Sequence, residues 1–291
     1  MTSGVLVMDK PSGLTSFDVV ERVRRTRGAR KAGHTGTLDP MATGVLAVCV
    51  GEATKIVQFL VGGDKVYRAE ALLGVETDSQ DATGRVVRER EVKVDRERLD
   101  QAAASFVGRI QQIPPMHSAI HHEGKRLHQL ARAGIEVDRA PRVVVIHRLR
   151  IDSLDGPRVM MEVACSKGTY IRTLAADLGE RLGCAAHLTA LRRLEAFPFT
   201  LSQAVALEDA ASAPLVSPAT ALAFLPSIPL SPDLADRIRA GARPPDALGT
   251  GHTGLVRLEA PGGDLVAVAE IDGGVLRLRR VLLATLADDE R

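Results

Sequence analysis

Prolines concentrate in one stretch of this chain, and that stretch divides the sequence into two parts. Between Ser212 and Pro232 there are five prolines, namely Pro214, Pro218, Pro226, Pro229 and Pro232. Proline lacks the backbone donor and fixes its own φ, so this spacing excludes long helices and central strands there. A length of 291 residues also suggests roughly two domains. We therefore predict a large domain over residues 1–226 and a small one over residues 227–291.

The larger part contains both short apolar runs and amphipathic helical patterns, so strands and helices are both expected in it. Thr15, followed three residues later by Asp18, predicts the capped start of the first helix. The predicted strands are Gly4–Met8, Val45–Val50, Tyr67–Leu73, Arg85–Arg88, Arg142–Ile151 and Arg158–Cys165, and the other predicted helices are Thr54–Leu60, Asp95–Val107, Arg126–Ala133 and Thr169–Leu182. The smaller part has one predicted helix, Pro232–Ala240, and three apolar runs separated by Gly-rich turns, which indicates a small β-rich module.

The charges are unevenly distributed, although the net charge is only +2. Six cations stand between Glu21 and Lys31, whereas Leu201–Asp236 has acids and no Lys or Arg. Such a cluster is either a phosphate-binding surface or a solvated helix face, and the sequence supports both interpretations equally.

Several classes of protein are excluded or disfavoured. Three scattered cysteines do not make a disulfide framework or a zinc site, so we expect a reducing compartment and a cytoplasmic protein. The longest apolar run, Val45–Val50, is far below the ~20 residues that span a bilayer. No nucleotide, dinucleotide or metal motif is present, and we expect neither a cofactor nor a metal.

The segment Gly33–Gly44, GHTGTLDPMATG, is the most unusual in the chain. Its glycines, prolines and threonines have neither helical nor strand periodicity and therefore predict a loop. Asp39 followed by Pro40 is most often only a turn. The alternative is a functional carboxylate held on a loop between rigid strands, and the spacing alone does not choose between the two.

This segment resembles the catalytic motif of the TruB family of tRNA pseudouridine synthases. Six further stretches agree with that family in content and order. They are VMDKPSG at 7–13, KVYR at 65–68, QIPPM at 112–116, SKGTYIRT at 166–173, LGCAAHL at 182–188 and LRR at 191–193. The resemblance implies an α+β fold: a pseudouridine-synthase catalytic domain with a mixed, mainly antiparallel central sheet and an insert at about residues 110–140. It also implies a C-terminal PUA-like RNA-binding domain.

The resemblance further implies that the chain isomerises uridine 55 in the TΨC loop of tRNA by base flipping and covalent catalysis. It assigns catalysis to Asp39 as nucleophile, to Arg172 as a cation beside that carboxylate, and to Tyr67, whose ring stacks on uracil. His34 would fill the space that the flipped base leaves, while Tyr170 and Leu191 would line the nucleoside pocket. As isolated residues, Tyr67, Tyr170 and Leu191 are more typical of a core, and Arg172 of a helix surface.

We expect RNA contacts from the cationic cluster and from cations in two matched motifs. The residues are Lys10, Arg22, Arg25, Arg30, Lys31 and Arg193. The expected partner is tRNA, bound through its TΨC stem-loop and, by the C-terminal domain, its acceptor stem; the protein is expected to be a monomer. The alternatives are a non-catalytic tRNA-binding or tRNA-folding protein and a pseudouridine synthase for another RNA.

Histidines make the insert depart from the family pattern. His117 and His128 stand where relatives carry aromatic rings, and His121 and His122 lie between them. Without cysteine or regular ligand spacing, solvated or RNA-facing histidines are favoured over a zinc site.

Overall fold

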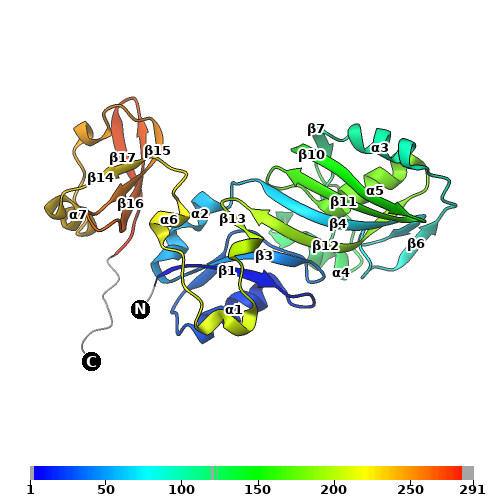
Figure 1. Ribbon diagram of the computed structural model, residues 1–291, viewed down its shortest axis with the longest axis horizontal. Helices are drawn as coiled ribbons and strands as arrows, with labels where there is room; N and C mark the ends of the chain where they lie inside the picture. The colour runs from blue at the N-terminus through cyan, green and yellow to red at the C-terminus, as the bar shows by residue number, and fades with distance from the viewer. Residues whose placement is uncertain (1–2, 119–120, 123, 284–291) are drawn as a thin grey trace. The chain divides into compact units, whose positions relative to one another are not determined.

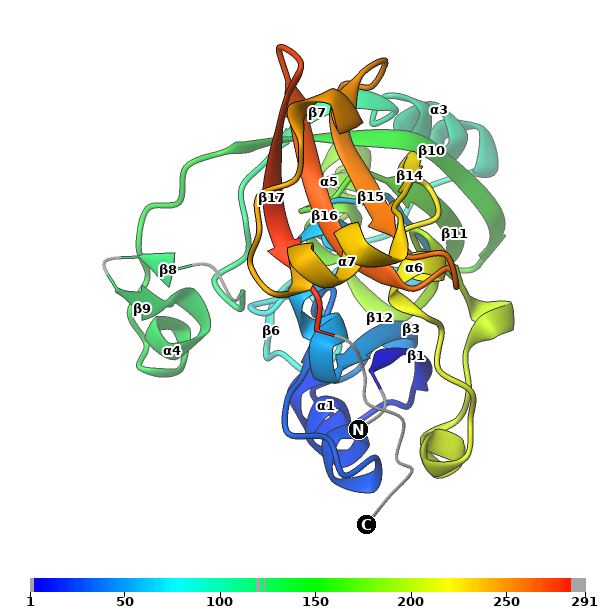
Figure 2. The ribbon, with the colours of Figure 1, turned by 90° about the vertical axis from the view of Figure 1, so that its left-hand side faces the viewer.

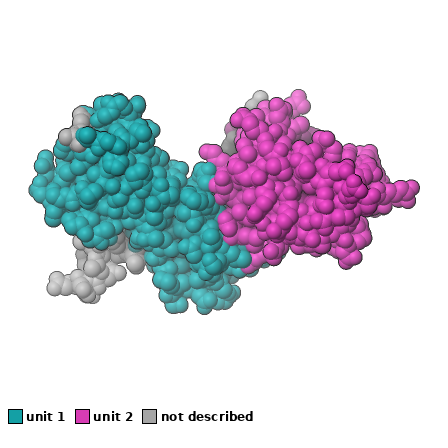
Figure 3. Space-filling model, turned by 45° about the horizontal axis from the view of Figure 1, so that its top comes forward, with its two compact units in different colours: residues 1–63, 196–291 teal, residues 64–195 magenta. Residues whose placement is uncertain are grey.

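The computed structural model describes residues 3–118, 121–122 and 124–283, and it consists of two compact units. The first unit combines residues 1–63 with 196–291, and the second comprises residues 64–195 (Figure 3). The first unit thus contains the N-terminal strands together with the C-terminal module. The domain boundary at residues 226 and 227 stays a prediction.

The first unit begins with a strand pair that carries the segment around Asp39. Strands β1 (Gly4–Lys10) and β3 (Thr43–Val50) are antiparallel, with Lys10 opposite Gly44, and β2 (Ala32–His34) also pairs with β3. Helix α1 (Ser16–Thr26) follows β1 and has the predicted Thr15–Asp18 capping box. Its apolar residues Val19, Val20 and Val23 are buried, because they recur at helical spacing, and the arginines lie on the other face.

Short elements connect this strand pair to the C-terminal module. In chain order they are the 3₁₀-helix η1 (Gly51–Ile56), α2 (Val57–Leu60), β13 (Phe199–Thr200), η2 (Leu201–Gln203), η3 (Leu207–Ala211) and α6 (Pro218–Ala221). The predicted helix Thr54–Leu60 is therefore only half correct, since its first part is 3₁₀. The proline-rich stretch is irregular as expected, apart from two short elements. They are α6, where Pro218 takes the first helical turn that tolerates it, and the three-residue strand β14 (Ser227–Pro229).

The C-terminal module is a four-stranded sheet with one helix (Figures 1 and 2). The strand order is β14 (Ser227–Pro229), β15 (Gly254–Glu259), β16 (Leu265–Asp272) and β17 (Val275–Val281), with α7 (Pro232–Arg239) and η4 (Asp246–Gly249) between β14 and β15. The three predicted apolar runs are the three antiparallel strands. Leu265, Val268 and Leu282 pack in one core cluster with Val5 and Val45 of the first strands.

The second unit is a sheet of five long strands with helices and a small hairpin. The order in the sheet is β12 (Ala186–Ala196), β4 (Lys65–Leu73), β11 (Arg158–Cys165), β10 (Arg142–Asp155) and β7 (Gly108–Gln112). The remaining elements are β5 (Val75–Thr77), β6 (Val86–Glu89), α3 (Arg96–Ala104), β8 (His121–His122), β9 (Lys125–Arg126), α4 (Leu127–Arg132) and α5 (Ile171–Leu182). Strand β11 pairs with β4 and β10 in antiparallel fashion. The predicted α+β class with a small β-rich C-terminal part is confirmed.

None of the helices in the described ranges is long and apolar enough to cross a membrane.

Candidate active site

Asp39 lies in a loop of the first unit that side chains hold from both ends. We call residues 35–42, between β2 and β3, the Asp39 loop. On one side, Ser16 at the start of α1 accepts from the Leu38 amide at 2.8 Å and donates to the Leu38 carbonyl at 3.0 Å. On the other side, the Gly13 amide donates to the Pro40 carbonyl at 2.8 Å. Asp39 itself is half-buried between these two attachments.

Lys10 makes the strongest of these attachments. Its side chain is completely buried, and Nζ donates to the carbonyls of Pro11, Pro40 and Ala42 at 2.9, 3.1 and 2.7 Å. A buried ammonium is tolerated only where its three donors are satisfied, and these carbonyls satisfy them. The geometry makes Lys10 a support of the Asp39 loop, so we leave it out of the proposed RNA surface.

His34 is the last residue of β2 and is half-buried. Its Nδ1 accepts from the Gly36 amide at 3.2 Å, which orients the ring at the entrance of the Asp39 loop. The acceptor role of Nδ1 places the proton of a neutral ring on Nε2.

Arg172 in the second unit is buried, contrary to the surface position that its pattern alone favours. It is the second residue of α5 and is only 3% exposed. Its guanidinium donates to the carbonyls of Ser79 and His117 at 2.9 and 2.7 Å and lies 3.5 Å from a carboxylate oxygen of Asp81. A buried guanidinium needs such acceptors, because an isolated charge in the interior is very costly.

Asp81 is the residue that the sequence did not reveal. Its other carboxylate oxygen accepts from the hydroxyls of Ser79 and Thr83 and from the Thr83 amide, so it is held on every side. Next to it, Gln80 has a φ of 63°, a left-handed conformation that is uncommon outside glycine. The sequence offers one signal for such a residue, because an arginine on the buried face of a helix requires an acid as its partner.

The two tyrosines of the chain both lie in the second unit. Tyr67 is on β4 opposite Val163 and is 8% exposed. Tyr170 precedes α5, and the Gln112 side chain binds its backbone twice, accepting from the amide at 3.0 Å and donating to the carbonyl at 3.2 Å. Gln112 belongs to the QIPPM motif, and the structure gives it this supporting role.

The remaining predicted pocket and RNA residues differ in exposure. Leu191 on β12 is 8% exposed and Arg193 on the same strand is 2% exposed. A side chain that is this deeply buried has no surface to offer a phosphate, so we also leave Arg193 out of the proposed RNA surface. Arg22, Arg25, Arg30 and Lys31 are exposed.

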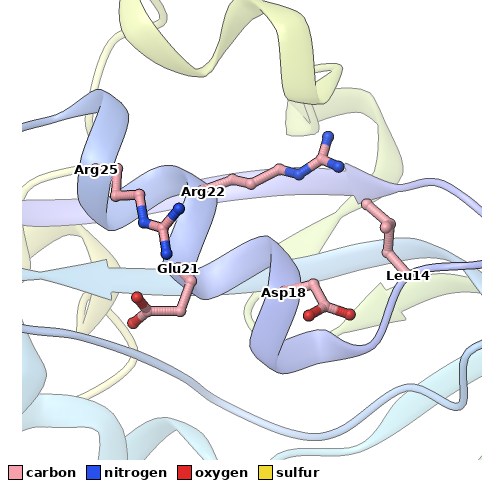
Figure 4. A pocket seen from close by; sticks show the side chains of 5 residues that line it. All are labelled: Leu14, Asp18, Glu21, Arg22 and Arg25. Carbon is pink, nitrogen blue, oxygen red and sulfur yellow. The ribbon is translucent and has the colours of Figure 1, made fainter.

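Two of these exposed arginines border a surface hollow on α1. Leu14, Asp18, Glu21, Arg22 and Arg25 line it; in Figure 4 the last four extend from α1 and Leu14 from the segment before it. The Thr15 hydroxyl and amide lower the pKa of Asp18, and a hydrogen bond from Arg24 lowers the pKa of Glu21, so both acids stay ionised. Glu21 pairs with Arg24 at 2.8 Å.

The histidine-rich insert does not decide between its two interpretations. The described part of the chain holds no group of three or more His, Cys, Asp or Glu that could bind a metal ion. The side chains of His121, His122 and His128 lie outside the described residues, so the zinc alternative is not tested.

Comparison with known proteins identifies the family. Residues 24–171 match the profile described as TruB family pseudouridylate synthase (N terminal domain), and residues 172–221 match the tRNA pseudouridylate synthase B C-terminal domain. The tRNA pseudouridine synthase B of Geobacter sulfurreducens is 47% identical over 96% of this chain and 99% of its own length. The chain belongs to the TruB family. It is therefore a pseudouridine synthase, an isomerase.

Other relatives agree over nearly the whole chain. The tRNA pseudouridine synthase B of an Azoarcus species is 46% identical over 97% of this chain and 95% of its own. A solved chain from "Crystal Structure of a Cbf5-Nop10-Gar1 Complex" is similar with a TM-score of 0.75 and 25% identity, covering 96% of this chain and 84% of that one. The pseudouridine-synthase fold that the motifs imply is thus confirmed.

Proposed function

We propose that this protein converts uridine 55 in the TΨC loop of tRNA into pseudouridine, with Asp39 as the nucleophile. The N1–C1′ glycosidic bond breaks, the base turns, and a C5–C1′ bond forms while C5 loses its proton and N1 gains one. The membership of the TruB family and the names of the relatives support a tRNA substrate. We also propose a cytoplasmic monomer.

The observation that carries this proposal is the support of the Asp39 loop. Ser16 and Lys10 fix the backbone on either side of the carboxylate through hydrogen bonds to Leu38, Pro40 and Ala42. An ordinary surface turn does not need a buried lysine to hold it. A preorganised nucleophile does, because an error of about 1 Å in its position costs roughly a hundredfold in rate.

Asp39 can act in three ways that the chemistry leaves open. A carboxylate attacks as an anion and needs no general base, so it can bond to ribose C1′ or to uracil C6; it can also assist by removing a ribose proton. We assign to Arg172 the role of a cation beside this carboxylate. Tyr67 stacks on the base with its hydroxyl near the proton that C5 loses, and Tyr170 and Leu191 line the pocket.

The target uridine is stacked in a folded loop, so the enzyme must extrude it at a cost of a few kcal/mol. We assign His34, which its bond to Gly36 orients, to the space left by the base. Arg22, Arg25, Arg30 and Lys31 hold phosphates of the TΨC stem-loop, and exposed arginines of the C-terminal module bind the acceptor stem.

The test is tritium release from tRNA labelled at C5 of uridine. Asp39→Asn should abolish release, while the matched control Asp209→Asn, an exposed acid on η3, should leave it unchanged. Transcripts with cytidine at position 55 should release nothing. Release from those transcripts at the wild-type level, or preferential release from rRNA fragments, would assign another target. Binding of tRNA without release would indicate a non-catalytic protein.

A further inference from the structure

Two side chains of η1 grip the end of the last strand of the C-terminal module. Lys55 Nζ donates to the Val281 carbonyl at 2.9 Å and to the Glu52 carboxylate at 2.6 Å. The same Glu52 oxygen accepts from the Leu283 amide at 2.9 Å. We call Glu52 and Lys55 the β17 latch, since together they bind the backbone on both sides of Leu282.

The residue between these two bonds is anchored as well. Leu282 is 3% exposed and lies in the core cluster that also contains Ala53 and Ile56 of η1. Its amide donates to the Val266 carbonyl at 2.9 Å. Three consecutive residues at the end of β17, Val281 to Leu283, are thus fixed to η1 or to the neighbouring strand. Ala53 and Ile56 already anchor η1 in this core, so the purpose of the two polar side chains lies in what they position.

The first residue of η1 connects the latch to the cationic segment, residues Arg22–Lys31. The Gly51 amide, at the start of η1, donates to the Lys31 carbonyl at 2.9 Å, and Ala32 of β2 pairs with Val50. Burial opposes ionisation of Glu52, but the hydrogen bonds from Lys55 and Leu283, and then the charges of Lys55 and Lys31, lower its pKa overall. Lys31 ends the cluster that begins at Arg22 and leads directly into β2 and the Asp39 loop.

Strand β17 carries a second set of exposed cations immediately before the latch. Arg277, Arg279 and Arg280 are exposed, and β17 is the edge strand of its sheet. Arg279 pairs with Glu270, and Arg277 lies 4.0 Å from Asp272. Ion pairs at this exposure are weak, so RNA phosphates can displace the acids. Arginine offers a planar fork of donors that matches phosphate oxygens.

We propose that Glu52 and Lys55 are positioning residues for long RNA. They hold the arginine edge of β17, formed by Arg277, Arg279 and Arg280, at a fixed spacing from the cationic segment Arg22–Lys31. An RNA that reaches both surfaces then gains from two contacts whose separation is set in advance, as linked binding sites do. A short hairpin that reaches only the cationic segment gains nothing from the latch. This inference rests on the proposed function, because it takes folded tRNA as the substrate.

The test compares full-length tRNA with the isolated TΨC stem-loop. Lys55→Met removes the bonds to Val281 and Glu52. It should raise KM for full-length tRNA by roughly tenfold, less than the roughly hundredfold that two linked surfaces can contribute, because the arginine edge is displaced and not deleted. The kcat on tRNA and both constants on the stem-loop should stay unchanged. The matched control is Lys93→Met, which removes an exposed ion pair with Glu91 in the other unit. It should change neither KM nor kcat on either RNA.

A second comparison separates positioning from general stability. Arg279→Ala with Arg280→Ala should raise KM for full-length tRNA, and adding Lys55→Met should then have no further effect, since the latch acts through those arginines. If Lys55→Met does not fold, Glu52→Gln serves instead, because it keeps an acceptor for the Leu283 amide while losing the charge that binds Lys55.

The outcomes are distinct. An equal rise of KM on both RNAs, no rise on either, or additive effects of the latch and arginine substitutions would overturn the inference. If wild-type protein releases no tritium from either RNA, the proposed function fails instead.

Discussion

The Arg172–Asp81 pair allows the sharpest prediction about the candidate site. Its side chains are 4% and 7% exposed, so the interaction lies in the protein interior. Asp81→Asn keeps an oxygen for Ser79 and Thr83 but turns an amide, which also donates, toward the guanidinium. Removing one partner of a buried pair costs about 3–5 kcal/mol. We expect the low end, about 3 kcal/mol, because the Ser79 and His117 carbonyls continue to bind Arg172.

The chain contains a matched control three residues away. Asp78 pairs with Arg85, whose side chain is 92% exposed, so Asp78→Asn should lower the free energy of unfolding by less than about 1 kcal/mol. Urea unfolding at pH 7.5 measures both variants. Single-turnover tritium release should fall in Asp81→Asn, because the guanidinium is no longer held, and should stay at the wild-type rate in Asp78→Asn. Equal costs in the two variants, or full activity of Asp81→Asn, would refute the role of the buried pair.

Three further predictions test the same physical reasoning. Lys10→Met should lower kcat by roughly a hundredfold with little change in KM, because it loosens the Asp39 loop; a raised KM with normal kcat would return Lys10 to the RNA surface. Burial and the charge of Glu180 raise the pKa of Asp177 to about 6, so the ionised carboxylate opposes folding above that pH. In urea unfolding at pH 7.5, Asp177→Asn should therefore stabilise the protein by about 1–2 kcal/mol, and this gain should vanish near pH 4. Burial, and then the charge of Arg193, lower the pKa of Lys65 to about 8. Relative to Lys65→Met, the wild type should therefore gain stability as pH rises from about 8 to about 10.5. A difference in melting temperature between the two proteins that does not change over this pH range would contradict the prediction.

The Asp177 prediction depends on an unusual environment. Across the described residues, none makes a hydrogen bond or an ion pair with this carboxylate. An acid whose folded pKa lies above its ordinary value contributes stability only while it is protonated, and that contribution is lost as pH rises through 6. The matched acid Glu180 pairs with Arg88, so Glu180→Gln should not stabilise the protein at pH 7.5.

Local signals in the sequence predicted the elements that local forces determine. The capping box at Thr15 places the start of α1 correctly, and α5 ends at Leu182 as predicted, where the left-handed Gly183 follows it. Strand β12 is the clearest omission. Its central residues Arg192 and Arg193 are typical of a surface, yet the strand pairs with β4 and most of its side chains are buried. Its position depends on neighbours far away in the chain, and hydrophobic alternation does not report them.

The candidate site shows the same contrast between local signals and contacts that are distant in the sequence. Asp39, Tyr67 and Arg172 are predicted from motifs, because each of them stands within a stretch that resembles the family. Their supports are not identified, because each support joins segments that are distant in the sequence: Ser16 with Leu38, Gln112 with Tyr170, Asp81 with Arg172. Lys10 was assigned to RNA for the same reason, since a lysine beside a turn gives no sign that carbonyls some thirty residues later will surround it.

Lys10 and Arg172 solve the same physical problem in the two units. Each cation binds loop carbonyls that have no partner in a helix or sheet, and such groups are costly when buried. A long cation extends from a regular element, β1 or α5, and satisfies several carbonyls at once. The charge gains acceptors and the loop gains rigidity. The shapes of the two cations differ, however: an ammonium directs three donors around one point, whereas a guanidinium directs its donors in one plane. Lys10→Arg should therefore fail to restore the rate that Lys10→Met loses, although it restores the charge, and single-turnover rates of the two variants would decide whether geometry or charge holds the Asp39 loop.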